Sequence, residues 1–495
     1  MKSSSQLRLF EEELVKYLDD DLMVLKALLP VQGAPDLRQD PDSLIRIFLN
    51  IEPLQENLAK VLLEKFAILS HEDFSKDDPK AGLHRKILNS LRWLNFVVNG
   101  TELTEKLMEI IDAASDDVLI EVIVSCPEII PDEFHEKVAT ALKEKYDNPR
   151  LTAAVLDTFG TLTLKPEVIM NLRHAVIKSL DSAPKEDLPV MVKFVSTSIT
   201  PKEALGEIEN LRSNLNLDRS KNVLSQMSSQ RLARRPTTKV QDGDDFDVMV
   251  MDIIRVSIYE IKIADAWFQA IVHADALKTL DVLVLLLLRD LPNKQKNIDA
   301  LVRNKIRSGE LTEELLKHCF KNHSKFIVTI FSSVQAIAES LMCSHEKVLQ
   351  GWSTSIYLHS FSHLNQYCKQ EIVVDLMTQI GTNVQTRNNA IATVYILAKD
   401  QTNVLTQFAV FISSMLDHVT TLTLPQVRKI MDILSILAYN SPKTLHSIRN
   451  DLHMAIRKQI TASGKQRNLK QIGILSAVGK IFLSRQVSGF TKVSG

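Results

Sequence analysis

Apolar residues recur every three or four positions along most of the 495-residue chain. This spacing lines apolar side chains along one face of a helix, and it recurs in segments of about 10–20 residues joined by short turns. Proline stands at the start of several segments, for example at Pro53, Pro166 and Pro201. A helix accepts proline there because its first N–H groups need no partner within the helix. The pattern predicts helices throughout, because no segment shows the alternation of apolar and polar residues that is typical of a strand.

The predicted helices pair at intervals of about 30–45 residues without a sharp sequence repeat, which favours an all-α solenoid of irregular HEAT/armadillo-like antiparallel helix pairs. We expect one helix over Leu7–Leu29 and another over Lys80–Val98. A third should end before Pro127, because proline interrupts a helix interior. The apolar run Leu277–Leu291 should lie in the core of the second half.

Residues 218–247 interrupt this pattern with a polar stretch in which Arg231, Arg234, Arg235 and Lys239 are followed by Asp242, Asp244, Asp245 and Asp247. We predict a flexible linker here, between a solenoid over residues 1–217 and a second over 248–495. Contact with nucleic acid or an acidic partner is the functional alternative. Ser225 and Ser229 each precede glutamine, which makes them possible phosphorylation sites.

The segment Ile298–Gly309 reads as an amphipathic helix that ends at its glycine. Its apolar stripe includes Lys305, so a lysine stands where the pattern expects an apolar residue. The lysine stem could cover apolar surface while the ammonium reaches water. Alternatively, Lys305 could be a modification site at the rim of a buried face, and periodicity leaves both interpretations open.

The composition permits a large core, with 45% apolar residues and a net charge of −1. Any contact with nucleic acid would therefore need a local basic face. The last helices offer one, unless it is an ordinary mixed-charge surface; the candidates are Arg457, Lys458, Lys465 and Arg467. Four separated cysteines without a CxxC pair favour free, buried thiols in a reducing compartment. The N-terminus lacks a signal-peptide core, and we expect a soluble cytoplasmic or nuclear protein.

Candidate catalytic chemistry is weak. His359 and His363 are four residues apart, with Cys368 beyond them, and Cys343–His345 forms a similar small cluster. A zinc site normally shows a second ligand pair, so side-chain packing is the better interpretation. The sequence contains no familiar nucleophile, phosphate-loop or metalloprotease motif. We predict a non-enzymatic protein with no metal and no cofactor.

The stretch RNKIRSG at 303–309 resembles the ubiquitin-acceptor segment of the Fanconi anaemia group D2 family. Five more segments resemble the family in the same order: Arg92–Ile111, Glu186–Thr200, Cys368–Ile380, Asp451–Ile460 and Lys470–Ile481. The similarity runs from about Gln6 to Phe482. Family members are far longer and carry a basic tail before this region, so we expect a fragment, a truncated product or an incomplete gene model.

The resemblance implies an α-solenoid scaffold of DNA interstrand crosslink repair in the nucleus. In this interpretation Lys305 accepts one ubiquitin from a dedicated ligase and its conjugating enzyme, and a deubiquitinase removes it. The modified chain pairs with the group I protein and clamps double-stranded DNA. Arg303 and Arg307 would orient acidic residues of the conjugating enzyme or lie near DNA.

The stretch Leu103–Phe134 also resembles a family region proposed to bind ubiquitin through a small helical module, but we favour a plain solenoid repeat for that segment. A rival for the whole chain is a generic HEAT-repeat adaptor in transport or ubiquitin-ligase assembly. An enzyme is the third interpretation.

Overall fold

The computed structural model describes residues 4–30, 43–70, 78, 82–92, 94–146, 148–218, 245–440, 446–460, 474 and 477. These residues form helices and one isolated bridge between Pro30 and Ser43, and they include no strand. The predicted all-α solenoid is thereby confirmed for this part of the chain. None of the helices described is both long enough and apolar enough to cross a membrane.

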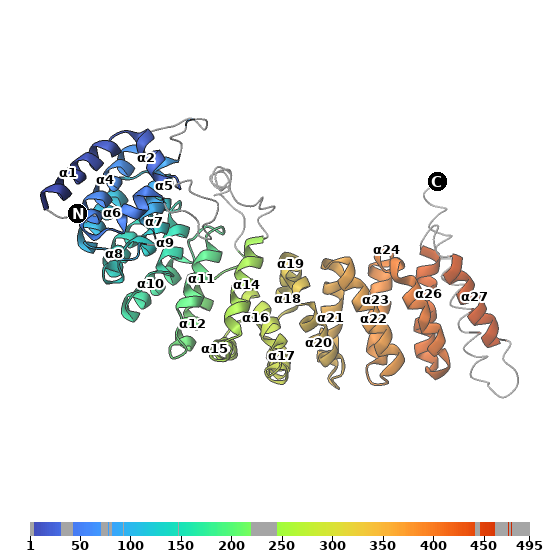
Figure 1. The fold of residues 1–495 in the computed structure, drawn as a ribbon. Helices are drawn as coiled ribbons and strands as arrows, with labels where there is room; N and C mark the ends of the chain where they lie inside the picture. The colour runs from blue at the N-terminus through green and yellow to red at the C-terminus, as the bar shows by residue number, and fades with distance from the viewer. Residues whose placement is uncertain are drawn as a thin grey trace. The chain divides into compact units, whose positions relative to one another are not determined.

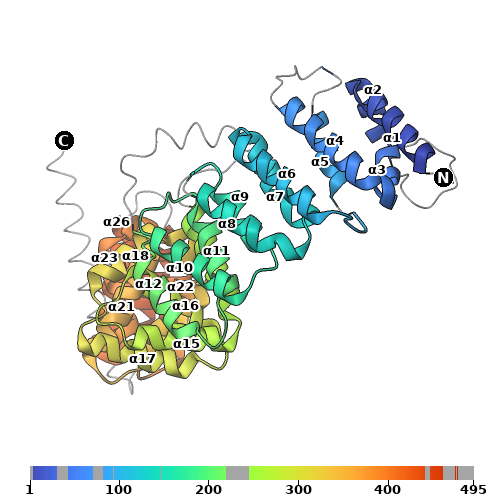
Figure 2. The same cartoon turned by 90° about the vertical axis from the view of Figure 1, so that its left-hand side faces the viewer.

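The chain divides into two units, the first ending with α12 and the second beginning just before α14. The helices of the first unit are α1 (Ser4–Leu18), α2 (Asp21–Leu28), α3 (Leu44–Leu49), α4 (Glu52–Ser70), α5 (Leu83–Leu91), α6 (Gly100–Ala113), α7 (Asp116–Ile129), η1 (Asp132–Phe134), α8 (His135–Lys145), α9 (Thr152–Phe159), α10 (Pro166–Ser179), α11 (Leu188–Ser198) and α12 (Ala204–Asn214). Neighbours in sequence pack together, as Figure 2 shows for α1 with α2, α4 with α5 and α6 with α7.

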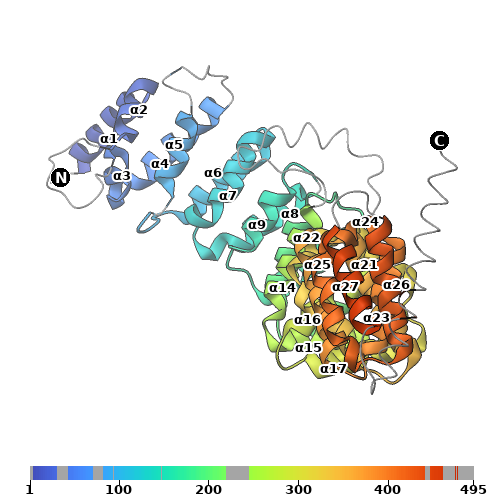
Figure 3. The ribbon, with the colours of Figure 1, turned by 90° about the vertical axis from the view of Figure 1, so that its right-hand side faces the viewer.

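The second unit runs from α14 to α27, whose helices stand side by side in Figure 1 and are viewed from the α27 end in Figure 3. Its helices are α14 (Asp245–Ile258), α15 (Ile261–Val272), α16 (Thr279–Asp290), α17 (Gln295–Ser308), α18 (Glu313–Asn322), α19 (Ser324–Thr329), α20 (Phe331–Met342), α21 (Lys347–His363), α22 (Gln366–Thr382), α23 (Arg387–Asp400), α24 (Thr402–Leu405), η2 (Thr406–Phe408), α25 (Ala409–Ser413), η3 (Ser414–Thr421), α26 (Leu424–Asn440) and α27 (His446–Ile460). Residues 279–288 of α16 are all buried, as the apolar run predicted.

Three helix predictions were wrong at their boundaries. The expected helix over Leu7–Leu29 breaks before Asp20, whose carboxylate caps α2 by accepting the Leu22 N–H at 2.8 Å. The expected helix over Lys80–Val98 ends at Leu91. Beyond Leu91, the Gln55 side chain forms hydrogen bonds with two backbone groups. It donates to Phe96 O at 2.8 Å and accepts from Val98 N at 2.6 Å.

Helix α7 continues through Pro127 to Ile129, where we had expected it to end. Proline has no N–H to donate to the Ile123 carbonyl one turn earlier. Thr158 Oγ1 of α9 donates to that carbonyl instead, at 3.1 Å and in a buried position. A hydroxyl from a neighbouring helix therefore supplies the missing bond, which a local pattern cannot reveal.

The two ends of the polar stretch 218–247 lie in ordered structure of the second unit. The Asp218 carboxylate accepts a hydrogen bond from Thr279 Oγ1 at 2.6 Å and lies 3.3 Å from Nε2 of buried His323. Helix α14 begins at Asp245, three residues before the predicted start of the second solenoid. Ser225 and Ser229 lie outside the described residues.

Candidate functional site

Helix α17 carries the candidate modification site. Its buried face consists of Ile298, Leu301, Val302, Lys305 and Ile306, which is the stripe that the sequence predicted. This face packs against α16 and α20. Only 6% of Lys305 is exposed. The lysine is therefore enclosed with the apolar residues, and its ammonium does not extend to water as a snorkelling side chain would.

Three acceptors surround the Lys305 amine. Nζ donates to the carbonyl of Val272 at 3.3 Å and to that of Ala274 at 3.2 Å, and it forms an ion pair with the Glu310 carboxylate. Val272 is the last residue of α15, where the helix dipole is negative, and Ala274 follows two residues later, just after the helix cap. A lysine ammonium has three N–H donors, so its hydrogen-bonding capacity is filled.

The end of α17 explains why Glu310 reaches this amine. Gly309 adopts the left-handed conformation with φ of 78°, which a residue with a side chain rarely adopts. The chain then folds back, and the Leu311 N–H donates to the Lys305 carbonyl at 3.1 Å. Ser308 Oγ donates to Glu310 at 2.7 Å and holds the carboxylate over the amine. Hydrogen bonds from Lys305 and Ser308 lower the pKa of the Glu310 carboxyl, outweighing the effect of burial.

The two flanking arginines point to other partners. Arg303 donates to Ser340 Oγ of α20 at 2.6 Å. Arg307 forms two hydrogen bonds with Glu346, at 2.6 and 3.1 Å, just before α21 begins. The group paired with Lys305 is therefore Glu310, which the sequence analysis missed. An acidic residue directly after a helix-ending glycine was the signal that could have identified it.

The basic candidates near the C-terminus are only partly described. Arg457 and Lys458 lie in the last turn of α27, and both are exposed. Lys465 and Arg467 fall outside the residues that the structure describes. Two of the four candidates therefore lie together at the end of α27. The arrangement of all four lies outside what the structure describes.

The histidine pair lacks the surroundings of a metal site. The rings of His359 and His363 stack with centroids 6.4 Å apart, and burial lowers the pKa of both imidazoles. Across the described residues, no group of three or more histidine, cysteine, aspartate or glutamate side chains could hold a metal ion. Cys126, Cys319 and Cys368 are buried as expected, whereas Cys343 is exposed, contrary to the prediction of buried thiols.

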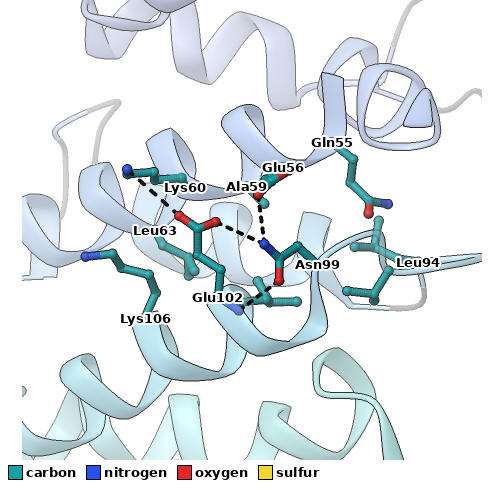
Figure 4. A pocket seen from close by; sticks show the side chains of 11 residues that line it. Gln55, Glu56, Ala59, Lys60, Leu63, Leu94, Asn99, Glu102 and Lys106 are labelled. Carbon is teal, nitrogen blue, oxygen red and sulfur yellow. Dashed lines mark hydrogen bonds and ion pairs between the residues drawn. The ribbon is translucent and has the colours of Figure 1, made fainter. Parts of the chain in front are cut away.

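Leu103–Phe134 forms α6, α7 and η1, and its apolar residues mainly face the core. Against α4, helix α6 leaves a shallow groove, shown in Figure 4. Asn99 bridges the groove by donating to Glu56 at 2.8 Å, and Lys60 lies 3.9 Å from Glu102. Ala59, Leu63, Leu94 and Leu103 contribute apolar surface.

Comparison with known proteins identifies the family. A family model described as "Fanconi anaemia protein FancD2 nuclease" matches residues 10–486. The chain belongs to the FancD2 family. It is 33% identical to the mouse (Mus musculus) Fanconi anemia group D2 protein homolog over 451 residues, 88% of this chain and 31% of the mouse protein. The chicken (Gallus gallus) Fanconi anemia group D2 protein is 29% identical over 463 residues, 90% of this chain and 32% of the relative.

This chain therefore spans about a third of the length of these relatives. Among solved structures, Kap121p bound to Ste12p has 12% sequence identity and a TM-score of 0.41, covering 95% of this chain and 49% of that one. Similarity at that level adds nothing to the fold assignment, which rests on the helices described above.

Proposed function

We propose that this FancD2 chain is a non-enzymatic scaffold of DNA interstrand crosslink repair, acting in the nucleus as part of the Fanconi anaemia pathway. Lys305 accepts a single ubiquitin, and the modified protein pairs with the group I protein to clamp double-stranded DNA. One observation carries the proposal: the acceptor-like segment RNKIRSG places its lysine, alone among cations, on the buried stripe of α17. Membership of the FancD2 family supports the assignment to this pathway.

In this proposal the ligase system carries out the chemistry of ubiquitin transfer. The deprotonated Lys305 amine attacks the thioester carbonyl that joins ubiquitin to a cysteine of the conjugating enzyme. An isopeptide bond forms, the carbon–sulfur bond breaks, and the cysteine leaves as a thiolate while the amine proton passes to a base. This chain supplies only the nucleophile and its position on a rigid helix.

Two basic regions serve the partners in this proposal. Arg307 already binds a carboxylate, Glu346, with two hydrogen bonds, so it can exchange that partner for an acidic residue of the conjugating enzyme. Arg303 lies on the same helix and plays the same role. Arg457 and Lys458, together with Lys465 and Arg467, contact DNA phosphates without reading sequence.

Reconstituted ubiquitin transfer tests the proposal. The chain is incubated with the group I protein, ubiquitin, the activating and conjugating enzymes and the Fanconi ligase. We expect one adduct, which Lys305→Arg abolishes. Lys296→Arg is the matched control, because Lys296 is an exposed lysine on the same helix and its loss should change nothing.

Adducts scattered over many lysines, or an adduct that survives Lys305→Arg, would contradict the assignment of the acceptor and favour a generic HEAT-repeat adaptor. Cleavage of DNA by the purified chain in the presence of Mg²⁺ would contradict the non-enzymatic role. Treating the product with the deubiquitinase should return the unmodified mass.

A further inference from the structure

The Lys305 amine cannot react in the position that the structure shows. All three of its N–H donors have acceptors, two of them backbone carbonyls and the third the Glu310 carboxylate. An amine attacks through a lone pair directed at the carbonyl carbon, and here acceptors occupy all three directions around Nζ. The reacting atoms must also approach to about 3–3.5 Å, and an enclosed amine offers no such approach to a thioester.

The three acceptors differ in how readily they can be removed. The carbonyls of Val272 and Ala274 are fixed by the backbone at the end of α15. Glu310 comes from the turn after Gly309, and 28% of its side chain is exposed. Water or another protein can therefore reach the carboxylate, so Glu310 is the acceptor that can be withdrawn.

We propose that Glu310 is a latch: a positioning residue that holds the Lys305 amine in its buried site and must release it before modification. This inference rests on the proposed function, because it concerns the regulation of the same lysine. Ser308 is the second part of the latch, since its hydroxyl holds the free oxygen of Glu310 at 2.7 Å. Gly309 is the third part, because its left-handed conformation brings Glu310 back over the helix end.

A lysine-labelling experiment on the folded, full chain tests the latch without ubiquitin. The chain is treated with a small amine-acylating reagent, and the rate of modification at each lysine is read by peptide mass spectrometry. In the wild type, Lys305 should react far more slowly than exposed Lys296. Glu310→Gln should accelerate acylation at Lys305 by about tenfold, because it replaces a hydrogen bond between charged groups with a weaker one to a neutral amide oxygen.

The matched control is Glu346→Gln. Glu346 also pairs with a basic residue of α17, Arg307, but it does not touch Lys305. Its substitution should leave the Lys305 rate unchanged. Ser308→Ala provides a second variant in case Glu310→Gln fails to fold, because Ser308 is exposed and its removal loosens Glu310 without changing the carboxylate. It should raise the Lys305 rate by about twofold, as expected for one weaker hydrogen bond.

The outcomes separate the latch from the proposed function. Equal acylation of Lys305 in wild type, Glu310→Gln and Glu346→Gln would overturn the latch even if ubiquitin is attached to Lys305. Faster acylation at Lys305 in Glu310→Gln and Ser308→Ala supports the latch. If the ligase system then fails to modify Lys305 in any variant, the latch stands and the acceptor assignment fails.

Discussion

Among the described residues, each unit has a long basic side chain buried beside a carboxylate, and the two arrangements differ in how firmly they hold that side chain. In the first unit, Arg173 of α10 is 1% exposed. Its guanidinium donates to Ser198 O at 2.7 Å, to Glu203 at 2.9 Å and to Glu207 at 3.0 Å. It therefore connects α10, the end of α11 and α12 through a planar fork of donors.

In the second unit, Lys305 is held by one carboxylate and two helix-end carbonyls. The carboxylate comes from the turn that ends the lysine's own helix, so the ion pair connects no additional helix. A lysine can lose its proton, whereas an arginine in a protein does not. Burial of a cation is therefore compatible with two roles, a permanent connection at Arg173 and a releasable nucleophile at Lys305.

The largest expected effect is at Arg173. Arg173→Met removes the charge but keeps a long side chain, and it leaves Glu207 buried beside only His174. Breaking a buried ion pair in this way costs about 3–5 kcal/mol. Amide hydrogen exchange of α10 and α12 should report that loss. Lys178→Met, an exposed position on the same helix, is the control and should leave exchange unchanged.

A smaller effect should appear on acidification. Burial raises the pKa of the Glu207 carboxyl, but hydrogen bonds from Arg173 and His174 outweigh it, and the pKa lies below its ordinary value of 4.5. A lowered pKa in the folded state adds stability that is fully present above the unfolded value and is lost as the pH falls through the folded value. The decline is at most about 1.4 kcal/mol per pH unit for one proton.

Protection factors in α10–α12, which are exchange rates corrected for the intrinsic pH dependence of amide exchange, should therefore fall as the pH falls below 4.5, and Glu207→Gln should flatten that fall. An identical pH profile for the two proteins would contradict the role given to Glu207.

Gly309→Ala should cost about 1 kcal/mol, because a residue with a Cβ is strained at φ of 78°. No heavy atom lies within 4 Å of an added Cβ there, so the cost is conformational and not a steric clash. Gly351→Ala is the control: it lies inside α21, is equally uncrowded, and should stabilise by about 0.5–1 kcal/mol. Hydrogen exchange of α17 and α21 distinguishes these opposite signs.

The smallest effect is at the site itself. Lys305→Met should change stability by no more than about 1 kcal/mol, because a long apolar side chain suits the buried stripe and the partly exposed Glu310 can turn to water. Hydrogen exchange should show a much smaller loss of stability for Lys305→Met than for Arg173→Met. Equal losses at the two positions would remove the distinction between a fixed and a releasable cation.

The sequence predicted α17 and the place of Lys305 on its apolar stripe, because helical periodicity alone decides which side chains share a face, but it left open whether the amine reaches water. It could not predict the acceptors from α15, since Val272 and Ala274 lie about thirty residues away and act through backbone carbonyls. The continuation of α7 through Pro127 was unpredictable for the same reason, because Thr158 of α9 supplies the missing donor. Local patterns define single helices, whereas these outcomes depend on contacts between helices.

The most direct test of the account acylates the folded wild-type chain first and supplies the ubiquitin-transfer system second. The account predicts that exposed lysines such as Lys296 are blocked while the enclosed Lys305 amine stays unmodified and then accepts ubiquitin. Peptide mass spectrometry reads both modifications in one sample. Acylation of Lys305 to the same extent as Lys296, before any ubiquitin is added, would contradict the claim that the acceptor amine is enclosed in the folded protein.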